Sequence, residues 1–191
     1  MRPSRMSNLP SRRQALFGAT LTFGALWTTL SLPSVAMAQT TLSWSPKVLT
    51  QAQAQVLEVA VDLIIPTTDT PGAREAGVAR FIDRAMGNFY DAGQVKTMRD
   101  GLDRMQADAL SGYGAAFTSL DAGRQTELLT RYDAEAARLP LTHFFALIRQ
   151  ATTVGFFTSE TGATRTLRYD PFPGEYRGCV PLKEIGRAWA T

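Results

Sequence analysis

The sequence predicts an all-α fold: about five helices in one small domain, preceded by an N-terminal signal peptide and followed by a long irregular C-terminal segment. Three observations support this class. Apolar residues recur at helical spacing in separate stretches, and capping residues, prolines and glycines punctuate the chain between those stretches. The helical spacing fades after Gly155, so residues from about 155 to 191 form the predicted irregular segment.

Residues 1–38 have the pattern of a twin-arginine export signal. Arg12 and Arg13 stand side by side after Ser11, and a mildly apolar run follows over residues 15–32. Glycines and threonines dilute this run, which makes it a poor candidate for a stable membrane span. Because the twin-arginine pathway carries folded proteins, the leader predicts a chain that folds before it is exported.

A small-residue pattern, in which Ala36 and Ala38 flank Met37, predicts cleavage of the leader before Gln39. The mature chain would then comprise residues 39–191, a length that suits one domain with its own core. Ordinary secretion and an uncleaved anchor are the alternative interpretations of the leader.

The net positive charge of the chain comes from the leader. The sequence has 20 Lys and Arg residues and 17 Asp and Glu residues; four arginines and no acid precede Gln39, so 16 basic and 17 acidic residues remain in the mature chain. The sequence pI of about 9.3 is therefore a property of the leader and does not indicate nucleic-acid binding.

The first helix is predicted over residues 51–65. Thr50 and Gln53 have the spacing of a capping box, and apolar residues follow at helical intervals. A buried strand over residues 59–65 is a minor alternative, because β-branched residues are frequent there.

A turn at Pro71 and Gly72 ends this first pattern. Helical spacing resumes over residues 78–89, and a third helix is predicted to start after Asp91, with an apolar stripe that continues to Met105. Its charged positions are expected to form a solvated face.

Two further helices are predicted in the second half of the domain. Ser119 or Asp121 can cap a helix that continues to about Arg138. A fifth, apolar helix is predicted over residues 141–154, with Pro140 near its start.

The side chains that usually carry chemistry are scarce. Cys179 is the only cysteine and His143 the only histidine, which excludes an internal disulfide, a cysteine-rich cluster and a His-based metal site within this chain. We interpret His143 as structural or interfacial, and Asp100 and Asp103 as surface charge. No catalytic, cofactor-binding or metal-binding residue is predicted.

The C-terminal segment is unusually rich in aromatic residues for a stretch with little predicted secondary structure. Aromatic residues and arginine are enriched at protein interfaces. The candidate interface residues are Phe156, Phe157, Tyr169, Phe172, Tyr176 and Arg177. The equally weighted alternative is that these side chains pack back onto the protein's own helices.

Two blocks of sequence resemble a known family. The first runs from Asp62 through Pro66, Pro71 and Gly72 to Asp83, and the second covers residues 153–179 and contains Gly-Phe-Phe-Thr-Ser-Glu and Pro-Gly-Glu-Tyr-Arg-Gly-Cys. Both resemble the gluconate 2-dehydrogenase subunit 3 family, the small subunit of periplasmic FAD-dependent sugar and sugar-acid dehydrogenase complexes. The likeness spans the mature chain, more weakly through its middle helices.

The resemblance implies a role that depends on partners. A large flavoprotein of the glucose–methanol–choline type would hold FAD and oxidise the sugar, glucoside or sugar acid, and a cytochrome c subunit would hold haem c and accept the electrons. This chain would be non-catalytic, hold no cofactor, and assist maturation and co-export of the flavoprotein through the twin-arginine translocase. Its location would be the periplasm, with attachment to the outer face of the inner membrane through the complex as an option.

Cys179 is a candidate for an inter-subunit disulfide, because it has no internal mate and lies in a segment of glycine and proline. A small buried hydrophobic residue is the alternative interpretation. For the whole chain, two other functions are open: a free-standing periplasmic enzyme that uses carboxylates, and a structural or membrane-anchoring subunit.

Overall fold

The computed structural model describes residues 42–139, 142–172, 174–175 and 178–190. These residues form helices and no named strand; the only bridge given for them is an isolated parallel pair, Arg168 and Trp189. The predicted helical class is confirmed. The predicted signal peptide, with Arg12, Arg13, Ala36 and Ala38, lies outside the described residues.

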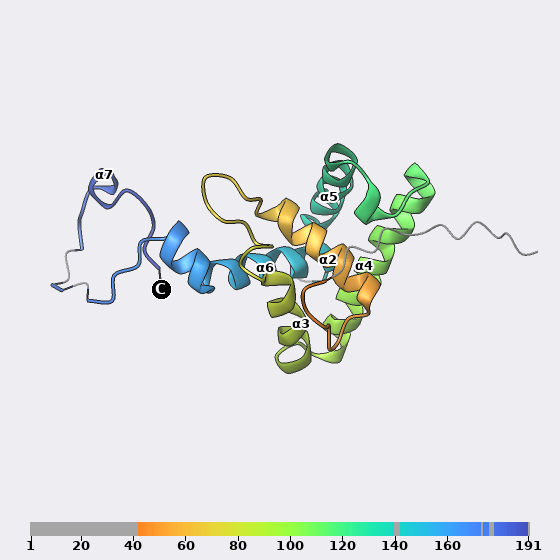
Figure 1. Ribbon diagram of the computed structural model, residues 1–191, viewed down its shortest axis with the longest axis horizontal. Coiled ribbons are helices and arrows are strands. Elements are labelled where there is room, and N and C mark those ends of the chain that lie inside the picture. Colours follow the sequence, from red (N-terminus) through yellow and green to blue (C-terminus); the bar gives the residue numbers. More distant parts are fainter. Residues whose placement is uncertain (1–41, 140–141, 173, 176–177, 191) are drawn as a thin grey trace, which may run out of the picture. The chain divides into compact units, whose positions relative to one another are not determined.

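The helical elements follow one another along the chain (Figure 1). They are α2 (Gln51–Ile64), α3 (Val78–Asn88), α4 (Ala92–Tyr113), η1 (Phe117–Ser119), α5 (Ala122–Ala136), α6 (Phe144–Phe157), η2 (Gly162–Thr166) and α7 (Leu182–Ile185). The longest connection between α2 and α6 is the loop over residues 65–77. The five predicted helices correspond to α2 through α6. Within the described part of the chain, none of the helices combines the length and the apolar character needed to span a membrane.

Local capping chemistry determines where most helices begin. The hydroxyl of Thr50 accepts a hydrogen bond from the backbone N–H of Gln53, and the Gln53 side chain accepts one from the backbone of Thr50, so the predicted capping box is confirmed. Asp91 and Gln94 form the same arrangement at α4. At α5 the cap is Asp121, whose carboxylate accepts from Arg124 N–H.

Helix α6 differs from its prediction at both ends. It begins at Phe144 instead of near residue 141, because the Nδ1 atom of His143 accepts a hydrogen bond from Phe145 N–H at 3.3 Å and acts as the N-cap. It also continues through Gly155 to Phe157. A Cβ at position 155 would lie 2.6 Å from the ring of Phe81, so glycine is required there by packing and does not mark a helix end.

Helix α6 lies at the centre of the core. It packs against α2, α3, α4 and α5, which surround it in Figure 1. Its apolar side chains, including Phe144, Phe145, Ile148 and Ala151, are buried. The core is therefore completed only when the last of the five helices docks.

The loop between α2 and α3 is a compact turn, as predicted from Pro71 and Gly72. The backbone N–H of Ala73 donates to the carbonyl of Ile65 at 2.9 Å, and Gly72 N–H donates to the hydroxyl of Thr67 at 3.1 Å. A Cβ on Gly72 would lie 2.6 Å from the Thr67 nitrogen. Glycine at this position lets the chain close the turn.

The segment before α2 is held by a buried carboxylate. Asp83 of α3 is 1% exposed and accepts hydrogen bonds from the backbone N–H groups of Lys47 (2.8 Å), Val48 (3.0 Å) and Leu49 (2.9 Å). The indole nitrogen of Trp44 donates to the carboxylate of Glu58 in α2 at 2.7 Å. Residues 44–49 are thus attached to both helices.

Candidate protein-binding surfaces

The residues that the structure describes contain no group of three or more His, Cys, Asp or Glu side chains placed to hold a metal ion. His143 is largely buried, and both of its ring nitrogens have contacts: Nδ1 caps α6, and Nε2 lies 3.4 Å from the carboxylate of Glu135. These contacts agree with the structural interpretation of this histidine.

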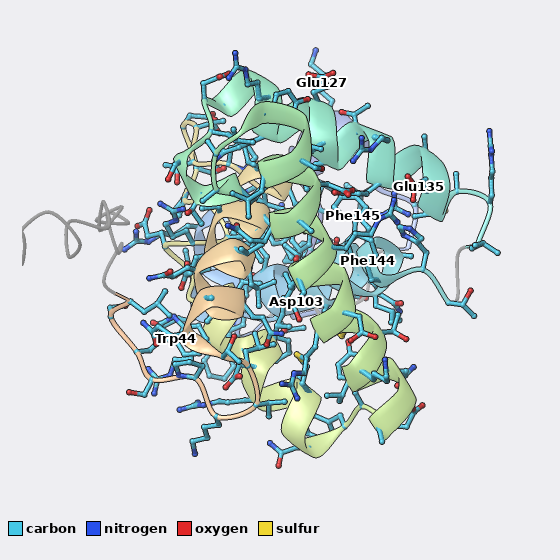
Figure 2. All side chains as sticks on the ribbon, turned by 90° about the vertical axis from the view of Figure 1, so that its right-hand side faces the viewer. Trp44, Asp103, Glu127, Glu135, Phe144 and Phe145 are labelled. Atoms are coloured by element: carbon cyan, nitrogen blue, oxygen red, sulfur yellow. The ribbon has the colours of Figure 1, made fainter. Side chains whose placement is uncertain are left out.

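Glu135 and Arg104 form a bidentate ion pair that joins α5 to α4. The two nitrogen–oxygen distances are 2.8 Å and 3.1 Å. The guanidinium group of Arg104 also lies 5.1 Å from the ring centre of Tyr132 and 5.9 Å from that of Phe144. Figure 2 labels Glu135 and Phe144 in this region. The hydrogen bond from Arg104 lowers the pKa of Glu135.

A second polar group lies on the same helices. The hydroxyl of Tyr132 donates to Asp108 at 2.7 Å, and Arg131 pairs with the same carboxylate at 2.7 Å. Burial, followed by the hydrogen bond to Asp108, raises the pKa of Tyr132. Each carboxylate of the two groups has a cationic partner, so the arrangement serves helix packing and offers no free general base.

The carboxylates singled out on α4 are also engaged. Asp103 accepts two hydrogen bonds from the side-chain amide of Gln53, at 3.0 Å and 2.9 Å, and Asp100 pairs with Lys96 one turn away. Asp100 is surface charge, as predicted, whereas the contact of Asp103 with Gln53 joins α4 to α2 and was not predicted.

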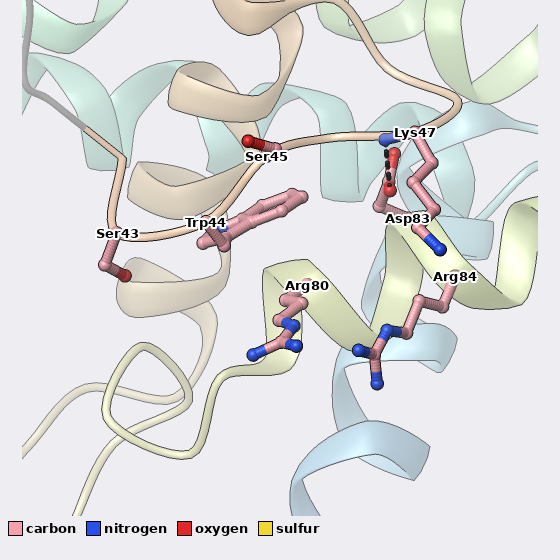
Figure 3. A pocket seen from close by; sticks show the side chains of 7 residues that line it. All are labelled: Ser43, Trp44, Ser45, Lys47, Arg80, Asp83 and Arg84. Carbon is pink, nitrogen blue, oxygen red and sulfur yellow. Dashed lines mark hydrogen bonds between the residues drawn. The ribbon is translucent and has the colours of Figure 1, made fainter.

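The described surface is hollowed in several places. A pocket of about 550 Å³ lies between α3 and α4, with Met86, Tyr90 and Val95 among its lining residues; partial burial raises the pKa of Tyr90. A smaller pocket of about 280 Å³, between Trp44 and α3, is lined by three cationic side chains and is shown in Figure 3. Neither pocket was predicted from the sequence.

The predicted interface residues of α6 have different surroundings. Phe156 is 1% exposed and packs in the core, with its ring centre 5.1 Å from that of Phe157 in an edge-to-face arrangement. It therefore follows the alternative interpretation, in which the aromatic side chain packs onto the protein's own helices. Phe157 is partly exposed at the end of the helix.

The C-terminal segment presents the other described candidates to solvent. Tyr169 is 59% exposed and Phe172 is 88% exposed. Asp170 accepts a hydrogen bond from the backbone N–H of Phe172 at 3.0 Å, which orders the turn that carries this ring. Cys179 is exposed and unpaired in this chain, whereas Tyr176 and Arg177 lie outside the described residues.

Sequence reasoning missed three exposed aromatic side chains. Phe81 and Phe89 fall within the helical spacing predicted over residues 78–89, but both are exposed. Trp189 lies beside Arg168, whose guanidinium carbon is 4.3 Å from the ring centre, and backbone hydrogen bonds join the two segments. No local pattern distinguishes these rings from core residues, because exposure depends on which helices pack nearby.

The comparison with protein families gives one match. The family model described as gluconate 2-dehydrogenase subunit 3 matches residues 51–174, which is more than half of the 191-residue chain. The matched region starts at the first residue of α2 and includes Tyr169 and Phe172. No curated protein and no solved structure matches the chain.

Proposed function

The chain belongs to the gluconate 2-dehydrogenase subunit 3 family, and on this premise we propose that it is the non-catalytic small subunit of a periplasmic FAD-dependent dehydrogenase. The large subunit is a flavoprotein of the glucose–methanol–choline type that oxidises a sugar, a glucoside or a sugar acid. FAD is bound by that subunit, and haem c by a cytochrome c subunit that receives the electrons.

The observation that carries the proposal is the extent of the family match. It covers all of α2 to α6 and continues into the segment that exposes Tyr169 and Phe172. Two solvated aromatic rings on a short, turn-forming segment are suited to insert into recesses of a larger partner. We assign this segment to contact with the flavoprotein.

The leader supplies the second part of the proposed function. Arg12 and Arg13 have the pattern of a twin-arginine signal. The small subunit binds the flavoprotein after it has folded around FAD in the cytoplasm, and its leader then directs both chains to the translocase. Assistance in maturation and co-export are two results of this one association.

The test is to change Arg12→Lys and Arg13→Lys together in a cell that produces all subunits. The flavoprotein is expected to remain in the cytoplasm, and periplasmic dehydrogenase activity is expected to disappear. Arg2→Lys with Arg5→Lys is the matched control, because it alters the same number of leader arginines outside the pair. Unchanged periplasmic activity in the twin-arginine variant would refute co-export.

A second experiment separates this function from the free-standing enzyme and from the anchor. The tagged chain is purified from the native cell without detergent, and the absorbance spectrum of the product is recorded. Flavin absorption from a larger chain and haem absorption from a third chain are expected, with an N-terminus at Gln39. Turnover of sugars or sugar acids by the isolated mature chain, with an artificial electron acceptor, would contradict a non-catalytic role.

A further inference from the structure

The pocket between Trp44 and α3 is strongly cationic. We call it the cationic pocket and define it by Trp44, Lys47, Arg80 and Arg84; Ser43, Ser45 and Asp83 complete its lining. Its volume is about 280 Å³. Figure 3 shows Arg80 beside the indole of Trp44, Arg84 one helical turn further along α3, and the side chain of Lys47 directed toward the same helix.

The positive charge of this pocket is only partly offset within the described chain. Asp83 is its one acidic lining residue; this buried carboxylate accepts hydrogen bonds from three backbone N–H groups and forms no ion pair with the three cations. Lys47, Arg80 and Arg84 form no ion pair with any residue that the structure describes. Six of the twelve described arginines do pair with a carboxylate: Arg74, Arg104, Arg124, Arg131, Arg149 and Arg165.

The fold holds these like charges close together. Arg80 and Arg84 are four residues apart on one helix, so their side chains leave the same face and repel each other. Asp83 fixes the backbone at Lys47, and Glu58 fixes the indole of Trp44. Three cations are therefore concentrated over one opening, which gives an anionic group from outside a ready counter-charge.

The surroundings of the pocket favour a protein partner over a small metabolite. Its volume of about 280 Å³ is at the lower limit of the roughly 300–1,000 Å³ typical of small-molecule sites. Phe81, between the two arginines in sequence, is exposed and lies against Gly155 of α6. Arginine next to exposed aromatic surface is typical of protein interfaces.

We propose that the cationic pocket docks an acidic peptide segment, with Asp or Glu side chains, on the surface of the large flavoprotein subunit. Arg80 and Arg84 bind the carboxylates, Lys47 adds long-range attraction, and the ring of Trp44 packs on the segment's aliphatic carbons. This inference rests on the proposed function for the identity of the partner. It adds a second contact, distinct from the C-terminal segment that bears Tyr169 and Phe172.

The test measures binding of the purified mature chain to the purified large subunit over a range of NaCl concentrations. Arg80→Gln with Arg84→Gln is expected to raise the Kd by about tenfold or more at low salt, and to make the Kd less dependent on salt. The matched control is Arg99→Gln with Arg138→Gln, since neither of these arginines has an ion pair among the described residues. The control variant should bind like the unaltered chain.

Two further measurements make the result specific. Arg80→Lys with Arg84→Lys keeps both charges and is expected to restore most of the affinity. The Gln variant should be at least as stable to urea as the unaltered chain, because the two exposed side chains form no ion pair with the described residues and their mutual repulsion is removed. A Gln variant that folds normally and binds the large subunit with unchanged Kd and salt dependence would overturn the inference while leaving the proposed function intact.

Two other outcomes would also overturn the inference. If the unaltered chain does not bind the large subunit, the proposed function is wrong, and the large subunit is not the partner of the cationic pocket. The other comparison measures binding of inorganic phosphate by the fluorescence of Trp44. The mature chain carries Trp189→Phe for this purpose, so that Trp44 is its only tryptophan. Saturable quenching by phosphate, together with complex formation that does not depend on Arg80 and Arg84, would show a small-anion site and overturn the docking proposal.

Discussion

Gly101 of α4 lies directly against the ring of Phe144 in α6. A Cβ at position 101 would stand 2.1 Å from Cγ of Phe144, far inside van der Waals contact. The absent side chain lets the central helix approach α4 closely, and Phe144 also packs edge-to-face on Tyr132 at 5.2 Å. This contact determines how α6 enters the core.

Gly101→Ala is expected to destabilise the protein by about 1–3 kcal/mol, because the new methyl group overpacks a filled position. Gly112→Ala is the matched control in the same helix, where nothing lies within 4 Å of the added Cβ. The free energy of unfolding of that control should rise by about 0.5–1 kcal/mol, because alanine has a better helix propensity than glycine. Urea unfolding followed by circular dichroism measures both; loss of stability in the two variants alike would contradict the packing argument.

The helix starts that depend on neighbouring residues could be predicted from the sequence. Thr50 with Gln53 is recognisable because both partners of the capping box lie within one turn. The start of α6 could not be predicted in this way. Pro140 indicated a start near residue 141, whereas the side chain of His143 caps the helix at Phe144. Gly101 and Gly155 indicate nothing locally, because the rings that require them come from other helices.

The candidate surfaces were predictable only in part. Phe156 and Phe172 both belong to the aromatic-rich C-terminal half, yet one is buried against other helices and the other is almost fully exposed. The i, i+4 spacing of Arg80 and Arg84 is visible in the sequence. That they form no ion pair with Asp83 is not visible, because it depends on the hydrogen bonds of this carboxylate to a distant backbone segment.

Asp83→Asn is expected to destabilise the protein by about 2–3 kcal/mol, since an amide cannot accept three hydrogen bonds as the carboxylate does and its NH₂ group faces N–H donors. Asp100→Asn, at an exposed ion pair, should change the free energy of unfolding by less than about 1 kcal/mol. Trypsin provides a local readout. Cleavage after Lys47 should accelerate in Asp83→Asn by a larger factor than cleavage after Lys96, which lies inside α4 and is exposed only when the helix opens; equal protection of Lys47 in both variants would refute the clamp.

Glu135 gives a prediction for the dependence of stability on pH. Arg104 lowers its pKa in the folded protein, so the ion pair contributes stability above the ordinary glutamate pKa of about 4.3 and loses it as the pH falls through the lower folded value. Glu135→Gln should cost about 0.5–1 kcal/mol at neutral pH, a modest value because the pair is partly exposed. The difference should vanish in acid. Glu160→Gln, with no ion pair among the described residues, should show no such trend.

Cys179 is exposed and lies beyond the family-matched residues, so its predicted role is tested separately from that of the rings. We expect a disulfide to the large subunit in the periplasm, which is an oxidising compartment. The purified complex should give a heavier band on non-reducing gels than on reducing gels, and Cys179→Ser should abolish that band. Identical mobility of the unaltered complex with and without reductant would rule out the bond.

The pair Phe156 and Phe172 separates folding from partner binding. Phe156→Ala removes a ring buried in the core and is expected to destabilise the mature chain by about 3–5 kcal/mol. Phe172→Ala removes a ring that is 88% exposed, so the free energy of unfolding should hardly change. Its effect should appear in the complex, where loss of an aromatic anchor weakens binding to the large subunit by at least about tenfold. If Phe172→Ala instead binds normally, the C-terminal ring is not an anchor, and contact with the flavoprotein must depend on other surfaces of the chain.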